Sequence, residues 1–176
     1  MSTIGVSIAI PAPYGEELQQ CRRAFGDPMA DAIPAHVTLL PPTEVEHADL
    51  PTVHDHLSKV AGDWEPFTMV LRGTGTFRPV SPVVFVQVAG GIAHCEQLQS
   101  AVRRGPVERD LHFPYHPHVT VAHHVPEAAM DRAFTQLAGY HCAFTVCGFD
   151  LYEHCPDEVW RSVATFPFAG EDREQP

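Results

Sequence analysis

The chain has 176 residues, of which 44% are hydrophobic and 19% charged, a composition that fits one folded domain and excludes a disordered chain. With 11 Lys and Arg against 22 Asp and Glu, the net charge is −11, which argues against binding along a long nucleic acid. A small local basic pocket remains compatible with that charge. No hydrophobic run approaches the roughly 20 residues of a membrane span, and the N-terminus lacks the basic region of a signal peptide. We therefore expect a cytoplasmic protein without a membrane partner, whose five cysteines are reduced thiols.

The first part of the chain predicts strands that alternate with helices. The hydrophobic patterns predict strands over residues 4–10, 36–40 and 67–77, and helices over residues 16–25 and 51–62. Pro41 and Pro42 are expected to stop the second strand, because proline removes a backbone donor. Gly73 and Gly75 predict a bulge in the third strand or a close approach of another group to its backbone.

The second part of the chain repeats this order of elements. It predicts strands over residues 83–88, 118–122, 143–152 and 159–168, and helices over residues 92–102 and 130–137. The repetition indicates a duplicated unit within a single domain that spans residues 1–176, with halves at about 1–78 and 79–168. No linker separates the halves, and residues 169–176 are expected to form a frayed tail.

Each half contains a histidine and a threonine on either side of a valine, at the start of a predicted strand. The first copy is His36-Val37-Thr38-Leu39 and the second is His118-Val119-Thr120-Val121. Because strand side chains alternate between faces, the histidine and threonine of each copy share one face, while the aliphatic residues point to the core. If an approximate two-fold axis relates the halves, the two pairs face each other across a groove.

Two such pairs suit the opening of a cyclic phosphodiester. One imidazole can take a proton from water while the other gives a proton to the departing sugar oxygen, since the ordinary pKa of histidine, about 6.5, allows either role. The threonine hydroxyls can donate hydrogen bonds to the phosphate oxygens. This scheme requires no metal or other cofactor and predicts a bell-shaped pH dependence around neutrality, but its symmetry leaves open which histidine is the acid. One such motif among 12 histidines would more often be a polar surface feature; the second copy, at the equivalent place, favours catalysis.

The doubled motif resembles that of the two-histidine (2H) phosphoesterase superfamily. Its bacterial 2'-5' RNA ligase and cyclic phosphodiesterase branch has a pattern similar to Tyr115-His116-Pro117-His118-Val119-Thr120-Val121-Ala122. The resemblance covers roughly residues 1–168 and implies an α+β fold that is bilobal, with two antiparallel sheets around a central cleft and helices on the outside. It implies hydrolysis of 2',3'-cyclic phosphates or related cyclic nucleotides, with reverse 2'-5' ligation as a side activity. It assigns His36 and His118 as the catalytic acid/base pair. Thr38 and Thr120 are assigned to bind phosphate.

Two positions depart from the pattern of that family. His123 stands where many RNA ligase-type relatives have arginine, and the first motif runs into Leu40-Pro41-Pro42 instead of a polar residue followed by an aromatic one. Both positions are expected at the rim of the groove. Together with the negative charge they favour a small nucleotide or an RNA terminus as the substrate. We expect the protein to be a monomer.

Other residues are candidates for binding the substrate. Arg78 precedes the second half and is expected to reach the phosphate, although a solvated arginine in a turn is an equally good interpretation. Tyr115 is a candidate to stack on a base, as are Phe77, Tyr152 and Trp160, but aromatic residues in such elements more often belong to the core.

Two other functions are compatible with the sequence. A nucleotide-binding or RNA-end-binding protein would keep the groove without catalysis. Such a protein could lose either imidazole, so the presence of both argues against this alternative. A metal-dependent hydrolase would use the histidine cluster at residues 112–124, but no H-E-x-x-H or C-x-x-C spacing supports a metal site. We therefore predict that no metal is bound.

Overall fold

A computed structural model describes residues 1–170 of the chain. The strands are β1 (Ser2–Ala9), β2 (His36–Val45), β3 (Phe67–Thr76), β4 (Val83–Gly90), β5 (His118–His123), β6 (His141–Val146), β7 (Gly148–His154) and β8 (Trp160–Pro167). The helices are α1 (Tyr14–Ala24), α2 (Leu50–Gly62), α3 (Ile92–Val102) and α4 (Glu127–Gln136), with short 3-10 turns η1 (Pro28–Asp31), η2 (His47–Asp49) and η3 (Gly105–Val107). Most of the predicted tail, residues 171–176, lies outside the described residues.

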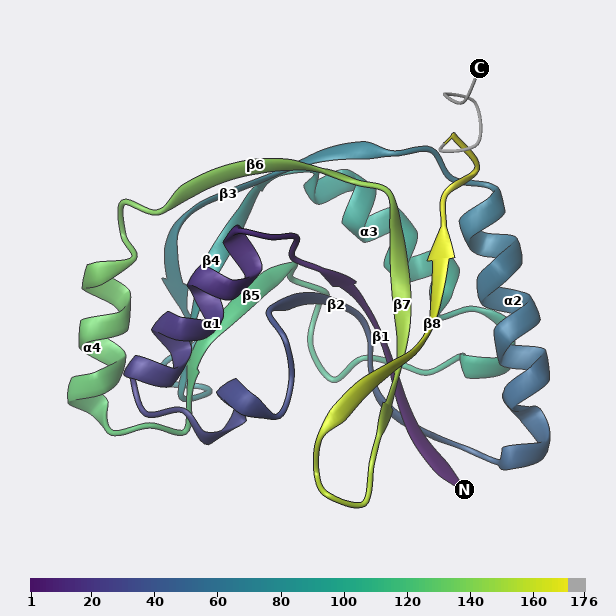
Figure 1. Ribbon diagram of the computed structural model, residues 1–176, viewed down its shortest axis with the longest axis horizontal. Coiled ribbons are helices and arrows are strands. Elements are labelled where there is room, and N and C mark those ends of the chain that lie inside the picture. Colours follow the sequence, from purple (N-terminus) through teal and green to yellow (C-terminus); the bar gives the residue numbers. More distant parts are fainter. Residues whose placement is uncertain (171–176) are drawn as a thin grey trace.

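Two antiparallel sheets of four strands each form the fold. Sheet A has the order β2-β1-β7-β8 and sheet B has the order β5-β4-β3-β6. Figure 1 shows α1 and α4 together at one end of the molecule and α2 at the other end, beside β8, with α3 between them. The predicted α+β architecture of two antiparallel sheets is confirmed.

The two strands that carry the histidine motifs, β2 and β5, are edge strands of different sheets. They contact each other where the sheets meet. The topology therefore brings together two segments that are far apart in the sequence.

The prediction that β2 ends at Pro41 is wrong, because the strand continues to Val45. An edge strand has only one neighbour, so a proline whose missing N–H would face outward costs no ladder hydrogen bond. The pairing with β1 shifts between Leu40 and Thr43, which oppose Val6 and Ile4. One extra residue in β2 is thus absorbed by a bulge at the prolines.

The single strand predicted over residues 143–152 is also wrong, since it is two strands in different sheets. β6 pairs with β3 in sheet B, and after Cys147 the chain enters sheet A as β7. A Cβ at Gly148 would lie 2.5 Å from the carbonyl oxygen of Phe166, so the chain needs glycine where β7 meets β8. A hydrophobic pattern does not reveal such a change of sheet, because both strands are apolar.

The third strand of the first half, β3, lies in sheet B between β4 and β6. The predicted bulge in β3 is confirmed, since its register with β4 shifts between Leu71 and Thr74. Gly73 has a φ of +71° at this point, a conformation that glycine adopts without strain.

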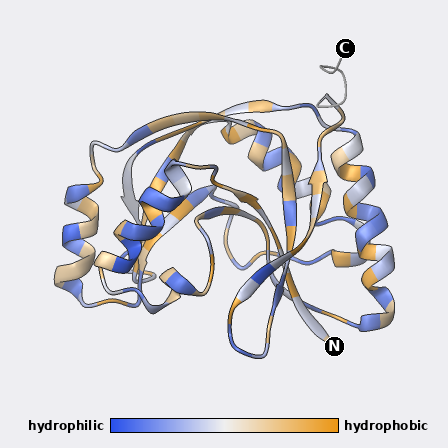
Figure 2. Cartoon of the chain, viewed as in Figure 1, coloured by the Kyte–Doolittle hydropathy of each residue, from blue (hydrophilic) through white to orange (hydrophobic). Residues whose placement is uncertain are grey.

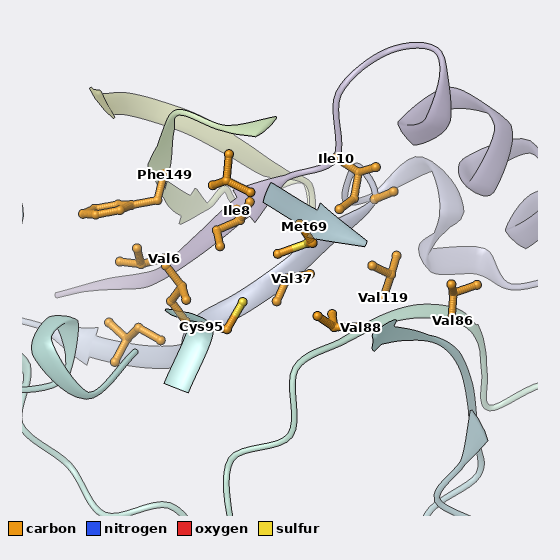
Figure 3. Packing of buried hydrophobic residues seen from close by; sticks show 14 of the residues in the cluster. Val6, Ile8, Ile10, Val37, Met69, Val86, Val88, Cys95, Val119 and Phe149 are labelled. Atoms are coloured by element: carbon orange, nitrogen blue, oxygen red, sulfur yellow. The ribbon is translucent and has the colours of Figure 1, made fainter. Parts of the chain in front are cut away.

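One hydrophobic cluster contains residues of both sheets and of all four helices. Val37 of β2 and Val119 of β5 are both 0% exposed and belong to this cluster, which also contains Met69 of β3 (Figure 3). Figure 2 shows hydrophobic and hydrophilic residues alternating along α1, α2 and α4, as expected of helices that cover a core with one face. Among residues 1–170, no helix has the length and apolar character needed to cross a membrane.

Candidate active site

The alternation of each motif strand separates core residues from site residues. In β2 the aliphatic residues Val37 and Leu39 are fully buried, whereas His36 and Thr38 remain partly exposed. In β5 both valines of the motif are fully buried, and its histidine and threonine are partly exposed in the same way. Each strand thus anchors its imidazole and hydroxyl through the core residues between them.

The two imidazole rings are held by equivalent hydrogen bonds. Nδ1 of His36 donates to the carbonyl oxygen of Pro34 at 2.7 Å, and Nδ1 of His118 donates to the carbonyl oxygen of His116 at 2.6 Å. A carbonyl oxygen can only accept, so Nδ1 carries the proton in both rings. In the neutral form, Nε2 of each ring therefore carries the lone pair and is the atom able to take or give a proton.

Thr38 lies at the boundary between the two motifs. It lines one hollow with His36 and a second hollow with His118. The hydroxyl of Tyr115 donates to the backbone carbonyl of Thr38 at 2.8 Å, which ties the segment before β5 to β2. This bond couples the position of His118 to the strand that carries His36.

Burial and nearby positive charge lower the pKa of both site histidines. The pKa of His36 is lowered to about 4, mainly by burial; the charges of Arg22 and His118 act in the same direction, and the hydrogen bond to Pro34 opposes them. Burial also lowers the pKa of His118 below its ordinary value. Because the charge of His118 acts on His36, the two rings lie within electrostatic reach of each other.

A buried ion pair lies within electrostatic reach of His36. Nε of Arg22 donates to Oδ2 of Asp27 at 2.8 Å, and the Asp27 side chain is fully buried. Oδ2 of Asp27 also accepts from the backbone N–H of His123 at 2.9 Å, at the end of β5. One carboxylate therefore joins the end of α1 to the strand of the second motif. The sequence analysis did not identify Arg22 or Asp27, because neither stands near a motif in the sequence.

The hollows beside the two histidines differ in size and lining. The His36 recess has a volume of about 100 Å³ and is lined by His36 and Thr38 together with Gly5, Ser7, Tyr152 and Trp160. The His118 recess has a volume of about 560 Å³ and is lined mainly by Thr76, Phe77, Val80, Phe113, His116 and His118. The duplicated motif thus sits in two different surroundings.

Arg78 is engaged with α4 in this structure. Its Nη1 bonds to Glu127 at 2.8 Å and to Asp131 at 2.9 Å, and its Nε donates to the hydroxyl of Thr76 at 3.1 Å. Arg78 is not among the residues that line either recess. Its predicted contact with phosphate stays a prediction, and it would require these carboxylates to release the guanidinium.

The four aromatic residues predicted to stack on a base line three different hollows. Tyr152 and Trp160 line the His36 recess, Phe77 lines the His118 recess, and Tyr115 lines the hollow that Thr38 shares with His118. Stacking on a base by these residues stays a prediction. The sequence analysis missed Phe113, which is 70% exposed; the signal for it was an aromatic residue beside a proline in the polar segment before the second motif.

The histidines near the end of β5 pair with each other. The rings of His123 and His124 stack with centroids 4.0 Å apart. Within residues 1–170, no three or more His, Cys, Asp or Glu side chains are arranged so that they could hold a metal ion.

A family model for the 2'-5' RNA ligase superfamily matches residues 10–158 of the chain. The chain belongs to this superfamily, the 2H phosphoesterases. A protein of Oceanobacillus iheyensis named provisionally as a phosphoesterase is 24% identical over 164 residues, which cover 92% of this chain and 95% of that protein. A protein of Halalkalibacterium halodurans with the same provisional name is 31% identical over 117 residues, covering 66% and 67% of the two chains.

Solved structures of similar proteins share the fold of this 2H phosphoesterase. TT0787 of Thermus thermophilus aligns with a TM-score of 0.68 and 23% identity, over 96% of this chain and 99% of that one. LigT of Escherichia coli in complex with 3'-AMP aligns with a TM-score of 0.67 and 18% identity, over 95% and 98%. The LigT complex with NADP+ aligns with a TM-score of 0.68 and 18% identity, over 96% and 98%. The family membership identifies the chain as an enzyme of the phosphoesterase class.

Proposed function

We propose that the protein hydrolyses 2',3'-cyclic phosphates of small nucleotides or RNA termini by acid/base catalysis between His36 and His118, without a metal. The observation that carries this proposal is the equivalent fixing of both rings, with Nδ1 of each bound to a carbonyl oxygen and Nε2 left for proton transfer. Membership in the 2'-5' RNA ligase superfamily supports the same chemistry, with reverse 2'-5' ligation as a side activity.

In this mechanism His36 is the base and His118 the acid. The neutral His36 ring takes a proton from water at Nε2 while the water oxygen bonds to phosphorus. The bond from phosphorus to one sugar oxygen breaks, and protonated His118 gives its Nε2 proton to that oxygen, which leaves a phosphomonoester and a hydroxyl group. The pKa of His36, lowered to about 4, and the adjacent charge of Arg22 favour the neutral form of His36, which is the form a base needs.

The threonines stabilise the charge that develops on the phosphate. Thr38 and Thr120 stand two residues after the histidines on the same strand faces, so their hydroxyls can donate to the non-bridging oxygens. A nucleotide as substrate is consistent with the ligand named for a LigT structure, 3'-AMP. The net charge of −11 favours a short substrate over a long RNA.

The proposal is tested by turnover of 2',3'-cyclic AMP in EDTA. We expect turnover by the wild-type protein and a loss of about 10²–10⁴-fold in both His36→Ala and His118→Ala. His141→Ala, which removes an exposed histidine of β6, is the matched control and should retain full activity.

Two outcomes would contradict the proposal. Tight binding of 2',3'-cyclic AMP without turnover would identify a nucleotide-binding protein instead of an enzyme. Activity that disappears in EDTA and returns with a divalent cation would identify a metal-dependent hydrolase.

A further inference from the structure

The His118 recess opens directly onto the proposed catalytic acid. The ring of Phe77 contacts the imidazole of His118 edge-on, with centroids 5.0 Å apart, and His118 itself lines the recess. A group that fills this space is therefore adjacent to the oxygen that His118 protonates.

Two of the side chains that line the recess are hydrophobic and largely exposed. Phe113, in the segment before β5, is 70% exposed, and Val80, in the turn between β3 and β4, is 77% exposed. Large apolar side chains that remain in water beside a catalytic group commonly mark a ligand site. A flat apolar group bound in the recess would cover part of the exposed surface of these side chains.

The chemistry of the lining selects an uncharged occupant. Of the residues that the structure describes, no Arg, Lys, Asp or Glu lines the recess. Arg78, which stands next to Phe77 in the sequence, is already paired with Glu127 and Asp131, so it offers no free positive charge. A phosphate chain would find no partner here, whereas a neutral aromatic ring would find aromatic and aliphatic walls.

Few polar groups of the lining are free to form hydrogen bonds with the edge of such a ring. The hydroxyl of Thr76 is occupied, because it donates to the carbonyl of Val83 and accepts from Arg78. The hydroxyl of Ser81 and the imidazole of His116 are the other polar side chains of the lining besides His118. Recognition would thus rest on stacking, which tolerates different bases.

We propose that the His118 recess binds the nucleobase of the substrate, between Phe113 and the turn that carries Val80. This inference rests on the proposed function and fixes the orientation of the substrate in the active site. The sugar then lies on the His118 side of phosphorus, where its oxygen leaves, and the attacking water lies in the smaller His36 recess. The substrates are single nucleosides or terminal nucleotides with a cyclic phosphate, with little preference among bases beyond a moderate one for larger purines.

The experiment compares a substrate with a base and one without. For Phe113→Ala we expect kcat/KM on 2',3'-cyclic AMP to fall about tenfold, mainly through KM, because stacking on one base contributes about that much. Turnover of glycerol 1,2-cyclic phosphate, which has no base, should be unchanged. Phe134→Ala, which removes a surface phenylalanine of α4, is the matched control and should alter neither reaction.

Calorimetry with 2'-AMP measures the affinity of the site for a nucleotide independently of turnover. We expect Phe113→Ala to weaken binding about tenfold and the surface control Phe134→Ala to retain it. Equal losses on both cyclic substrates, or unchanged activity and binding in Phe113→Ala, would overturn the proposal for the recess. A wild-type protein that binds 2'-AMP through Phe113 but hydrolyses neither substrate would instead overturn the proposed function.

Discussion

The surroundings of His36 and His118 differ far more than their motifs do. Both rings donate from Nδ1 to a carbonyl two residues earlier, and both strands are sheet edges. Around His36, however, the recess holds about 100 Å³ and a buried ion pair lies within electrostatic reach, whereas the recess at His118 holds about 560 Å³ and has exposed apolar side chains in its lining. The repeated motif supplies two imidazoles held in the same way, and the differences around them are the basis on which we propose a separate role for each.

The largest expected effect tests this assignment through the leaving group. On 2',3'-cyclic AMP, His36→Ala and His118→Ala should each lose about 10²–10⁴-fold. On bis(p-nitrophenyl) phosphate, which has no nucleoside or 2'-hydroxyl and whose p-nitrophenolate leaves without a proton, His118→Ala should recover most of its activity and His36→Ala should not. Steady-state rates on both substrates measure this contrast, and recovery by His36→Ala alone would reverse the roles.

The threonines should give the next largest effect. Thr38→Val and Thr120→Val each remove one hydroxyl that we place on a phosphate oxygen, so kcat should fall by roughly 10²-fold. Thr38 borders the hollows of both histidines, and its loss should be at least as large as that of Thr120. Thr165→Val, on the exposed face of β8, is the matched control. Unchanged kcat in both motif variants would remove the threonines from the mechanism.

The smallest expected effect concerns the ion pair within electrostatic reach of His36. Removing the positive charge in Arg22→Met should raise the pKa of His36, because that charge lowers it. The base is active when neutral, so the acidic limb of the kcat/KM profile should move to higher pH, by about one unit or less.

Arg22→Lys is the control for this substitution. It keeps the charge but loses the guanidinium geometry, so it should lose some stability while its acidic limb stays in place. An acidic limb that moves equally in both variants would indicate a structural effect instead of an electrostatic one.

The sequence predicted those features of the fold that depend on short-range alternation of hydrophobic and polar residues. The alternation around Val37 and Val119 predicted which side chains face the core, and it holds in the structure. The passage of β2 through Pro41 could not be predicted, because it depends on that strand being an edge of the sheet. The change of sheet at Cys147 likewise depends on pairing with distant strands.

The surroundings of the site were less predictable than the motifs. Asp27 reaches the end of β5 only through the folded chain, and nothing in its local sequence indicates that contact. The engagement of Arg78 with α4 also arises from tertiary structure, and it makes the predicted phosphate contact less direct. The bell around neutrality was predicted from two ordinary histidines; burial lowers the pKa of both rings, so the expected optimum moves to lower pH.

The most direct test of the two-imidazole mechanism is the pH dependence of kcat/KM for 2',3'-cyclic AMP. We predict a bell whose acidic limb reflects the His36 pKa near 4 and whose optimum lies below pH 6.5, because the acid, His118, must be protonated and its pKa is also lowered. A profile without two limbs in the wild-type protein would contradict the claim that one neutral and one protonated imidazole act together.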